Sequence, residues 1–446
     1  MEPKYIAALE IGSSHIRAAV GSVDDSGILT LLAVEEENAV DVVRYGIIQN
    51  VDELSNRIRL LIRRLENHNV VSPRKIKSLY VSLGGRSMMT TSRQVVRQYN
   101  DETEITSKIV EQIKEEAKAN GLSERTVVEV RPRGFVVDNL ECYTPVGTFG
   151  KNIVADINLI TCKPKILRNI EITLSKLQNI SIKASYVRQL AIADLVLSAD
   201  ERQLGCMLVD FGAETTTVSV YKNGTLRYLA TLPLGSRNIT RDIMALQYTE
   251  ERAEEIKRAI GDAVNAEPNY HKHDFDGDPI EVNNFIRARA GEIAVNIMEQ
   301  AKYAGYTLTA DLAGGIVLVG SGTKLKGFTD LLAKQSGVKA RLGSIPNTIR
   351  ISDPRLQGFE MIDIVALLNK VASENPEECM EAVVPVQPQV EIDPFDDGPG
   401  PQPIKEKEKK KAESVSEGAQ SSFRLRLWDK LRRKADNLFN DDPDGE

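Results

Sequence analysis

A short pattern occurs twice in this chain of 446 residues, and it constrains the fold more than any other feature. Residues 5–14 combine an apolar strand with an acid, a glycine and two hydroxyls, and residues 207–217 repeat that order. A glycine after a strand lets backbone amides approach a phosphate, and hydroxyls add further donors. One such turn fits a plain β-hairpin equally well. Two of them, about 200 residues apart, predict two similar halves that face each other across a nucleotide cleft.

The acids and donors of the two turns are the first candidate site residues. The first turn supplies Glu10, Gly12, Ser13, Ser14 and His15, and the second supplies Asp210, Gly212, Thr215 and Thr216. We expect the amides of both turns to clamp the β- and γ-phosphates of ATP. We also expect one carboxylate, that of Glu10 or Asp210, to hold Mg²⁺ through water.

Two further segments are predicted to bind the adenosine part of the nucleotide. An apolar strand at 316–319 runs into Gly320, Ser321 and Gly322, whose small size lets a flat ring lie against the backbone. Glu254 and Lys257 are three residues apart on a predicted helix and share a face. We expect this pair to bind the ribose and cover the adenine, and a solvated helical face is the alternative interpretation.

Composition and charge exclude several classes of protein. The formal net charge of −7 argues against general nucleic-acid binding, which needs a basic footprint. The four cysteines lie at no metal-ligand spacing and indicate buried thiols in a reducing compartment. No basic region followed by an apolar run marks a secretory signal, and no run of about eighteen apolar residues marks a membrane span. These features predict a cytoplasmic protein.

Alternating strands and helices are predicted along the first 372 residues. Residues 52–67 form an amphipathic pattern, with five apolar side chains on one helical face. Between 90 and 163 a short strand, a charged helix and two further strands indicate an inserted α/β subdomain. The other expected helices are 107–120, 169–179, 236–246, 249–260, 283–304, 326–336 and 359–370.

The end of the chain predicts a tethered amphipathic helix. Residues 373–421 are rich in proline and charge and contain too little apolar surface to fold, so a disordered linker is expected. The helix predicted at 422–440 has an apolar face formed by Phe423, Leu427, Trp428, Leu431, Leu438 and Phe439. Residues 423–434 contain six Lys or Arg and one Asp, a local charge of +5. This composition is typical of a helix that lies in a membrane surface, and packing on the core or in a partner's groove are the alternatives.

The order of these motifs resembles the actin, Hsp70 and sugar-kinase superfamily, and within it the FtsA family. The strand-to-helix segment Pro233–Ile243, which contains Gly235, is similar to a motif of that family. So are residues 136–150 and Val319–Leu325. The resemblance covers about residues 1–370 and the final helix. It implies an α/β, actin-like fold of two lobes with an inserted α/β subdomain, a disordered linker and a C-terminal amphipathic helix.

The resemblance also implies a domain plan. The first lobe would contain subdomain 1A at 1–84 and 166–195 and the inserted subdomain 1C at 85–165. The second lobe would contain subdomain 2A at 196–235 and 310–372 and subdomain 2B at 236–309. The linker would occupy 373–421, and the membrane-targeting helix would occupy 422–440.

Function and partners follow from the same resemblance. A member of this family would bind ATP, assemble into actin-like polymers and tether the ring of the tubulin-like protein FtsZ to the cytoplasmic face of the cell membrane. Its implied partners are FtsZ, later proteins of the division machinery, an anionic membrane surface and further copies of the chain, with no nucleic acid. Arg289 is the basic residue that best matches the contact with FtsZ. The gene product would be a peripheral membrane protein at the division site.

The chain departs from the family pattern in the phosphate site. Glu10 stands where the family has Asp, Ser13 and Ser14 where it has two threonines, and His15 where it has Lys. Arg188 and Gln189 stand where it has Glu-Pro, an acid that lies near the attacking water in relatives. A histidine is mostly neutral near pH 7 and is a weaker counter-charge for phosphate than lysine. We therefore expect nucleotide binding with slow or absent hydrolysis.

Other functions of the same superfold are the alternatives. A small-molecule kinase needs a general base beside an acceptor hydroxyl, and the sequence offers no convincing candidate. An Hsp70-like chaperone would need a folded substrate domain after residue 370. A pilus-assembly ATPase would lack the amphipathic tail, but the core alone does not separate it from the leading interpretation.

Overall fold

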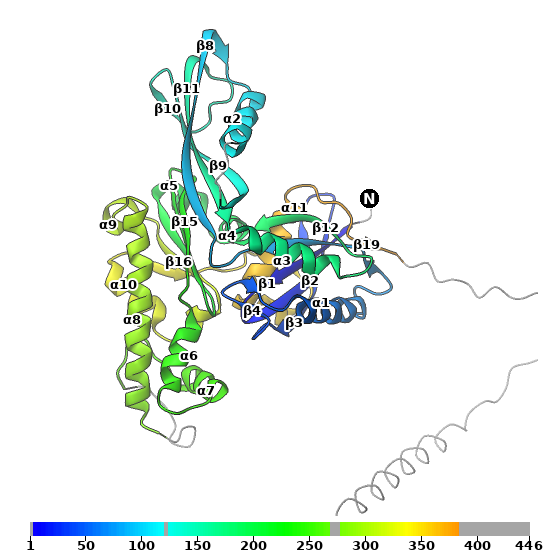
Figure 1. The fold of residues 1–446 in the computed structure, drawn as a ribbon, viewed down its shortest axis with the longest axis vertical. Helices are drawn as coiled ribbons and strands as arrows, with labels where there is room; N and C mark the ends of the chain where they lie inside the picture. The colour runs from blue at the N-terminus through cyan, green and yellow to red at the C-terminus, as the bar shows by residue number, and fades with distance from the viewer. Residues whose placement is uncertain (1–2, 120–123, 268–276, 383–446) are drawn as a thin grey trace, which may run out of the picture. The chain divides into compact units, whose positions relative to one another are not determined.

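The structure is a computed structural model that describes residues 3–119, 124–267 and 277–382. The predicted linker beyond residue 382 and the predicted amphipathic helix, with Phe423, Leu427, Trp428, Leu431, Leu438 and Phe439, lie outside the described residues. The described part is built around two large mixed sheets (Figure 1). We call the six-stranded sheet with its helices the first lobe, and the nine-stranded sheet with its helices the second lobe.

The first lobe begins with a three-stranded meander. Its strands are, in spatial order, β12 (Ser181–Val187), β7 (Ser78–Leu83), β1 (Lys4–Ile11), β2 (His15–Val23), β3 (Leu29–Asn38) and β18 (Arg350–Ile351). β1, β2 and β3 are antiparallel neighbours, whereas β7 and β12 continue the sheet in parallel. Helices α1 (Val51–Glu66) and α3 (Pro164–Ser175) pack together against this sheet, and α4 (Arg188–Val196) packs on α11 (Ile362–Ala372).

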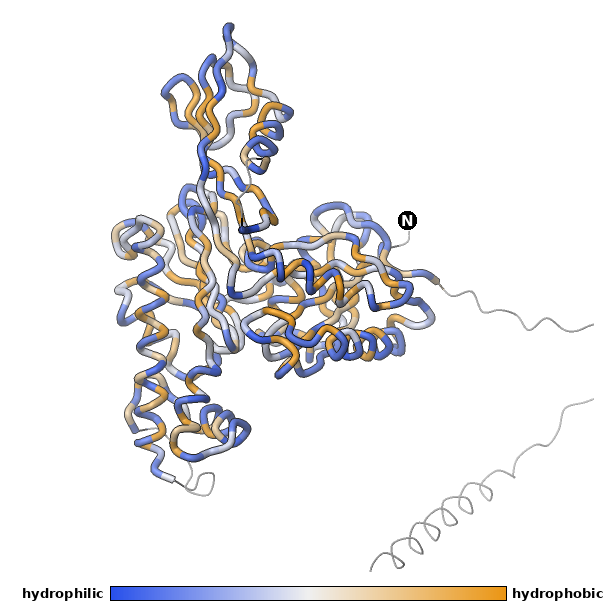
Figure 2. Tube along the Cα trace, in the orientation of Figure 1, coloured by the Kyte–Doolittle hydropathy of each residue, from blue (hydrophilic) through white to orange (hydrophobic). Residues whose placement is uncertain are grey.

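Helix α1 shows how the sequence forms these elements. The side chain of Asn50 caps its first turn by accepting a hydrogen bond from the amide of Glu53 at 3.0 Å. Its apolar face is buried as predicted, and Figure 2 shows the alternation of polar and apolar residues along it. The buried apolar side chains are Leu54, Ile58, Leu61, Ile62 and Leu65.

The second lobe repeats the strand, turn and strand of the first. In its sheet, β13 (Cys206–Phe211), β14 (Thr216–Lys222) and β15 (Thr225–Leu232) form a meander, and β16 (Gly315–Val319) and β17 (Ala340–Leu342) run parallel to β13. The helices of this lobe are α6 (Ser236–Met244), α7 (Glu250–Ile260), α8 (Pro279–Tyr303), α9 (Leu308–Asp311) and α10 (Phe328–Ser336). Phe211 and Phe328 stack in its core with ring centroids 4.6 Å apart.

The insertion differs from the expectation in one respect. Its elements are β8 (Met89–Glu104), α2 (Ser107–Ala119), β9 (Thr126–Val137), β10 (Leu140–Cys142) and β11 (Phe149–Cys162). The short strand expected near residue 90 is a strand of 16 residues. Most of its side chains are at least partly exposed, so it lacks the apolar alternation by which a strand is recognised. At Met89 it pairs with Ala230 of β15, so the insertion extends the sheet of the second lobe.

Two other boundaries differ from the prediction. The helix expected at 169–179 spans Pro164–Ser175, because proline is well suited to the first turn of a helix, where its missing N–H costs nothing. The linker was expected from residue 373, yet β19 (Met380–Glu381) pairs with β6 (Lys75–Ile76) beside the N-terminal strand. The remaining elements are β4 (Val43–Arg44), β5 (Ile47–Ile48), α5 (Ala199–Leu204) and short 3₁₀ turns at Ser321–Lys324, Pro354–Gln357 and Phe359–Met361.

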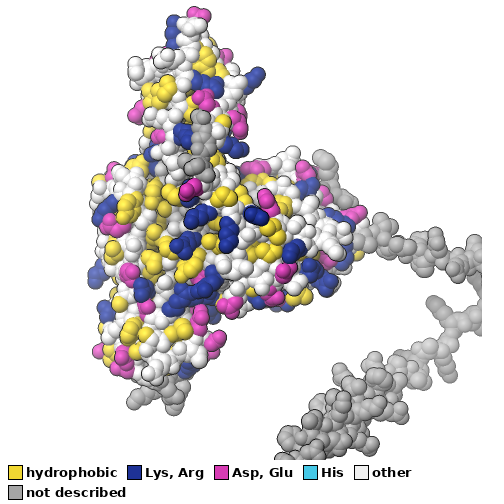
Figure 3. All heavy atoms as spheres, viewed as in Figure 1, with side chains coloured by type: hydrophobic (Ala, Val, Ile, Leu, Met, Phe, Trp, Pro, Cys, Tyr) yellow, Lys and Arg dark blue, Asp and Glu magenta, His cyan; other side chains and the backbone are white. Residues whose placement is uncertain are grey.

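The surface carries charge of both signs. Figure 3 shows that Lys and Arg side chains gather near the middle of the viewed face, although the formal net charge of the chain is −7. Within residues 3–382, apart from 120–123 and 268–276, no helix has both the length and the apolar composition needed to cross a membrane.

Candidate functional site

The two predicted turns have the same backbone geometry and line one cavity. In the first turn the amide of Gly12 donates to the carbonyl of His15 at 3.0 Å, and in the second the amide of Gly212 donates to the carbonyl of Thr215 at 2.9 Å. A cavity of about 50 Å³ lies between the turns and is lined by both. The internal repeat seen in the sequence is therefore a structural repeat as well.

The strand that precedes each turn ends in a buried carboxylate. Glu10, one residue before the end of β1, is 1% exposed, and Asp210, one residue before the end of β13, is 4% exposed. The guanidinium of Arg188 lies between them, with Nη1 3.1 Å from Glu10 Oε1 and Nη2 3.4 Å from Asp210 Oδ2. Arg188 is the first residue of α4, and its side chain joins β1 of the first lobe to β13 of the second.

Burial dominates the electrostatics of this group. It raises the pKa of Asp210 to about 7 and also raises the pKa of Glu10, and Arg188 opposes both shifts. Asp363, in the first turn of α11, adds a third negative charge nearby. Burial disfavours the charge on Arg188, yet the three carboxylates outweigh it and raise its pKa above the ordinary value. Arg188 is therefore permanently charged.

These residues do not suit the magnesium ion predicted for Glu10 and Asp210. The structure places both candidate carboxylates in the lining of the same small cavity. The space between them holds the guanidinium of Arg188, which offers hydrogen-bond donors and no oxygen ligand. Mg²⁺ needs a near-octahedral shell of oxygen atoms.

The hydroxyls of the first turn are engaged in local hydrogen bonds. Ser13 Oγ accepts from the amide of Gly46 at 2.8 Å, and Ser14 Oγ lies 2.8 Å from Nδ1 of His15. Burial lowers the pKa of His15, although Glu36 opposes the shift. His15 is therefore largely neutral near pH 7, as we expected from its ordinary pKa.

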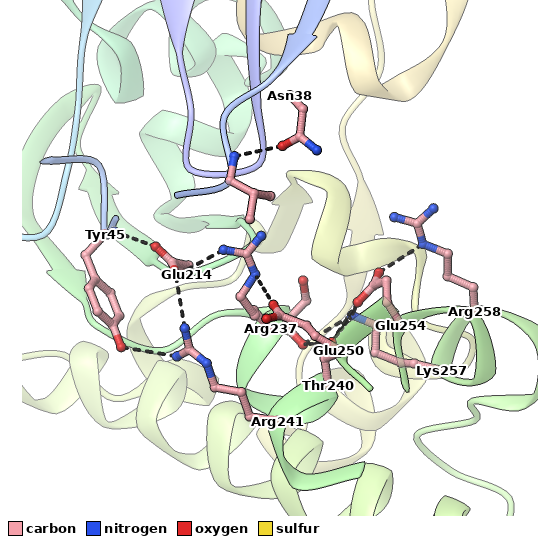
Figure 4. Close-up of polar contacts among 12 residues, drawn as sticks. Asn38, Tyr45, Glu214, Arg237, Thr240, Arg241, Glu250, Glu254, Lys257 and Arg258 are labelled. Atoms are coloured by element: carbon pink, nitrogen blue, oxygen red, sulfur yellow. Dashed lines mark hydrogen bonds and ion pairs between the residues drawn. The ribbon is translucent and has the colours of Figure 1, made fainter. Parts of the chain in front are cut away.

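The second turn contains a carboxylate that the sequence analysis did not single out. Glu214 is 1% exposed, and its Oε2 accepts from the amide of Tyr45 in the first lobe at 2.6 Å. Its Oε1 accepts from Arg237 at 3.2 Å and from Arg241 at 3.1 Å, both on α6 (Figure 4). An acid in a hydroxyl-rich turn, followed by two arginines four residues apart, was the available signal.

Two predicted residues support the second turn without lining the cavities. Thr216 is fully buried, and its hydroxyl donates to the carbonyl of Leu234 at 2.7 Å. Gly235 caps α6, where a Cβ atom would lie 2.3 Å from the carbonyl oxygen of Ala213. Only glycine allows this close approach of the helix to the turn.

Four of the five predicted adenosine residues line a larger cleft of about 920 Å³, and the fifth, Gly320, lines the small cavity. Glu254 and Lys257 are 2.6 Å apart on its wall, and both bond to Thr240, at 2.6 and 3.0 Å (Figure 4). Ser321 and Gly322 line the same cleft. At Gly320 (φ +87°) a Cβ atom would lie 2.6 Å from Oδ1 of Asp210, so this strand end packs directly on the buried acid.

The structure thus gathers most of the predicted nucleotide residues around two connected hollows. Ser14, His15, Ala213 and Ser321 line both the small cavity and the larger cleft. All the predicted residues except Thr216 and Gly235 line one or the other. A volume of several hundred Å³ with a few convergent polar groups is typical of small-molecule sites. Nucleotide binding at these residues stays a prediction.

Arg289 lies on α8, away from both hollows. Its Nε is 2.6 Å from Asp242 Oδ2 and its Nη2 is 2.9 Å from Asp242 Oδ1, which is a bidentate pair between α8 and α6. It also contacts Glu292 one turn further on. The predicted contact residue is thus held by two acids of its own chain.

The fold and the two hollows define the class of protein. The PilM-PilN type IV pilus biogenesis complex has a chain that superposes with a TM-score of 0.58, over 83% of this chain and 98% of that one. The two share 17% sequence identity, so this likeness concerns the fold alone. The chain is a two-lobed α/β protein of the actin-like class with an inserted subdomain.

Sequence comparison places the chain within that class. The family model for cell division protein FtsA matches residues 207–357, and the model for the SHS2 domain inserted in FtsA matches residues 84–161. The FtsA of Porphyromonas gingivalis is 30% identical over 343 residues, which cover 74% of this chain and 71% of that protein. The FtsA of Bacillus subtilis is 28% identical, covering 84% and 88%. The chain belongs to the FtsA family of cell-division proteins, and its role is in cell division.

The contacts of Glu214 generate a first prediction. We expect Glu214→Ala to lower the free energy of unfolding by about 3 kcal/mol, because it leaves Arg237 and Arg241 without their buried partner. It should also speed hydrogen exchange at the amide of Tyr45. Chemical denaturation and hydrogen exchange measure the two effects. The exposed acid Glu255 is the control, and Glu255→Ala should change neither quantity; equal effects of the two substitutions would contradict the interlobe role.

A second prediction concerns acid stability. Burial raises the pKa of Glu254, but the charge of Lys257 and the hydrogen bonds to the carboxylate outweigh it and lower the pKa to about 2. The ionised carboxylate therefore stabilises the fold above its unfolded pKa near 4.5, and this contribution is lost as the pH falls from there through about 2. Glu254→Gln should flatten the fall of unfolding free energy across this window, measured by denaturation at a series of pH values. The prediction is wrong if unfolding free energy falls with pH equally steeply in Glu254→Gln and in the wild type.

Proposed function

We propose that this chain is an ATP-binding adaptor of the cell-division machinery. It assembles into actin-like polymers, tethers the FtsZ ring to the cytoplasmic face of the cell membrane and recruits later division proteins. The observation that carries the proposal is the pair of matching phosphate turns at a shared cavity, in a chain that belongs to the FtsA family.

The two hollows support ATP as the ligand. The small cavity between the turns is suited to phosphate groups, since the turns around it present backbone amides and hydroxyls. The larger cleft has room for a nucleoside and offers Glu254, Lys257 and Ser321 on its walls. Hydrolysis should be slow or absent, because Arg188 stands where the family has the acid near the attacking water.

The terminal segment supports the membrane part of the proposal by its sequence. Each basic residue near an anionic surface contributes about 1 kcal/mol, and burial of the apolar face adds several more. A single helix of this kind binds reversibly, whereas many helices on one polymer bind firmly through avidity. β19 ends at Glu381, and the 39 residues from 383 to 421 leave room for the helix to reach a surface away from the core.

The membrane and FtsZ parts are tested together by co-sedimentation with anionic liposomes. Purified FtsZ from the same organism is mixed with the full chain or with a version that ends at Ser421. We expect FtsZ to pellet with liposomes only in the presence of the full chain. If the full chain itself stays in the supernatant, the tail is not a membrane anchor. If the chain pellets and leaves FtsZ behind, its cargo is another protein.

The FtsZ contact is tested at Arg289. We expect Arg289→Glu to weaken binding of the FtsZ C-terminal peptide at least about tenfold, because it reverses the charge offered to the partner. The matched variant is Asp242→Asn, which removes the charge of the intramolecular partner but keeps the positive charge of Arg289, whose contact with Glu292 remains. It should bind the peptide as well as the wild type or better, as measured by fluorescence anisotropy. Equal loss in both variants would show that the pair has only a structural role.

A further inference from the structure

We propose that Arg188 is a built-in cation that takes the place of a divalent metal ion in this cleft, so that nucleotide binds without one. The inference rests on the proposed binding of nucleotide and concerns how this particular chain achieves it. It arises from a mismatch: the sequence predicts that Glu10 or Asp210 holds a magnesium ion through water, whereas in the structure both carboxylates contact the guanidinium of Arg188.

The neighbouring backbone confines the side chain of Arg188. Its guanidinium lies against Gly84, where a Cβ atom would be 3.3 Å from both Cζ and Nη2. Any larger residue at position 84 would press on the guanidinium. The side chain of Arg188 is 14% exposed, and it reaches one carboxylate with each terminal nitrogen. This is an enclosed, charge-assisted bridge rather than a surface ion pair.

The guanidinium of Arg188 supplies the positive charge that a metal ion between two acids would supply. Glu10 and Asp210 belong to different lobes and are buried, so their charges need a shared counter-charge. A guanidinium supplies one with fixed geometry and without any water ligands. The other oxygen of Glu10, Oε2, has no hydrogen-bond partner and faces Nη1 of Arg17 at 3.7 Å. Two arginines therefore surround the carboxylate that would otherwise face a metal.

Arg188 is also placed to meet a phosphate. It lines the small cavity together with Gly12, Ser13, Gly212 and Thr215, the residues of the two turns. A guanidinium has five N–H donors, and the two carboxylate contacts leave donors for an anion in that cavity. Arginine is well suited to phosphate because its donors match the spacing of the phosphate oxygens. The same side chain thus connects the acids and the phosphate, as a bridging metal does.

The first test compares nucleotide affinity with and without metal. The wild-type chain is titrated with the non-hydrolysable analogue AMPPNP in buffer with Mg²⁺ and in buffer with EDTA. We expect the two dissociation constants to agree within about threefold. Binding that is seen only with Mg²⁺ overturns the proposal.

The second test removes the arginine. Arg188→Ala should bind AMPPNP at least about tenfold more weakly than the wild type in EDTA, and Mg²⁺ should restore most of that loss. The control is Arg355→Ala, which removes an arginine that is 88% exposed and should change nothing. An Arg188→Ala variant that binds as tightly as the wild type in EDTA also overturns the proposal. If this variant fails to fold, the wild-type comparison alone decides.

A third measurement separates this proposal from the proposed function. The melting temperature of each protein is measured without nucleotide, with and without Mg²⁺. Mg²⁺ should raise the melting temperature of Arg188→Ala, whose two buried acids have lost their shared cation, and leave the wild type unchanged. If the wild type binds no nucleotide under any condition, ATP binding is refuted, yet this selective shift still supports the role of Arg188. No shift in the variant would refute that role.

Discussion

Two buried carboxylates determine how the halves of this molecule meet. Glu10 and Asp210 stand at the ends of strands whose neighbours are otherwise apolar, and isolated charges in such places are strongly destabilising. The side chain of Arg188 supplies a positive charge to both carboxylates. It can reach both because Arg188 begins α4, the helix that links the two lobes. That helix packs on α11, whose first turn carries Asp363 beside the same guanidinium. Chain connectivity, packing and charge therefore converge on one point.

The parts of the site that sequence could predict are those fixed by local geometry. The turns at Gly12 and Gly212 are each closed by a hydrogen bond to the residue three positions on, so their shape depends on a few neighbouring residues. The strands around them are short and apolar, and α1 has a marked apolar face. Such elements can be recognised without knowledge of the fold. The strand Gly315–Val319 and the glycines that follow it were predictable for the same reason.

The features of the fold and site that the sequence did not predict depend on contacts between residues distant in sequence. Glu214 is important because of Tyr45, 169 positions earlier, and no local pattern connects them. Arg188 was visible as a departure from the family pattern, but its place between the two acids follows from the meeting of two sheets. The length of β8 was missed because its exposed polar side chains hide its pairing with β11. Thr216 was predicted to donate to a phosphate, but its hydroxyl donates to the carbonyl of Leu234. The direction of that hydroxyl depends on the fold and could not be read from the sequence.

The two lobes are joined at the small cavity by charged side chains of the protein itself. The carboxylate of Glu214, in the second lobe, accepts a hydrogen bond from the amide of Tyr45 in the first. The guanidinium of Arg188 bridges Glu10 of the first lobe and Asp210 of the second. In a cleft that closes on a metal nucleotide, the ligand supplies both signs of charge. Here the chain supplies both, so the contact between the lobes has support that does not come from a ligand. Under the proposed function, a nucleotide would add its contacts to this existing interlobe network.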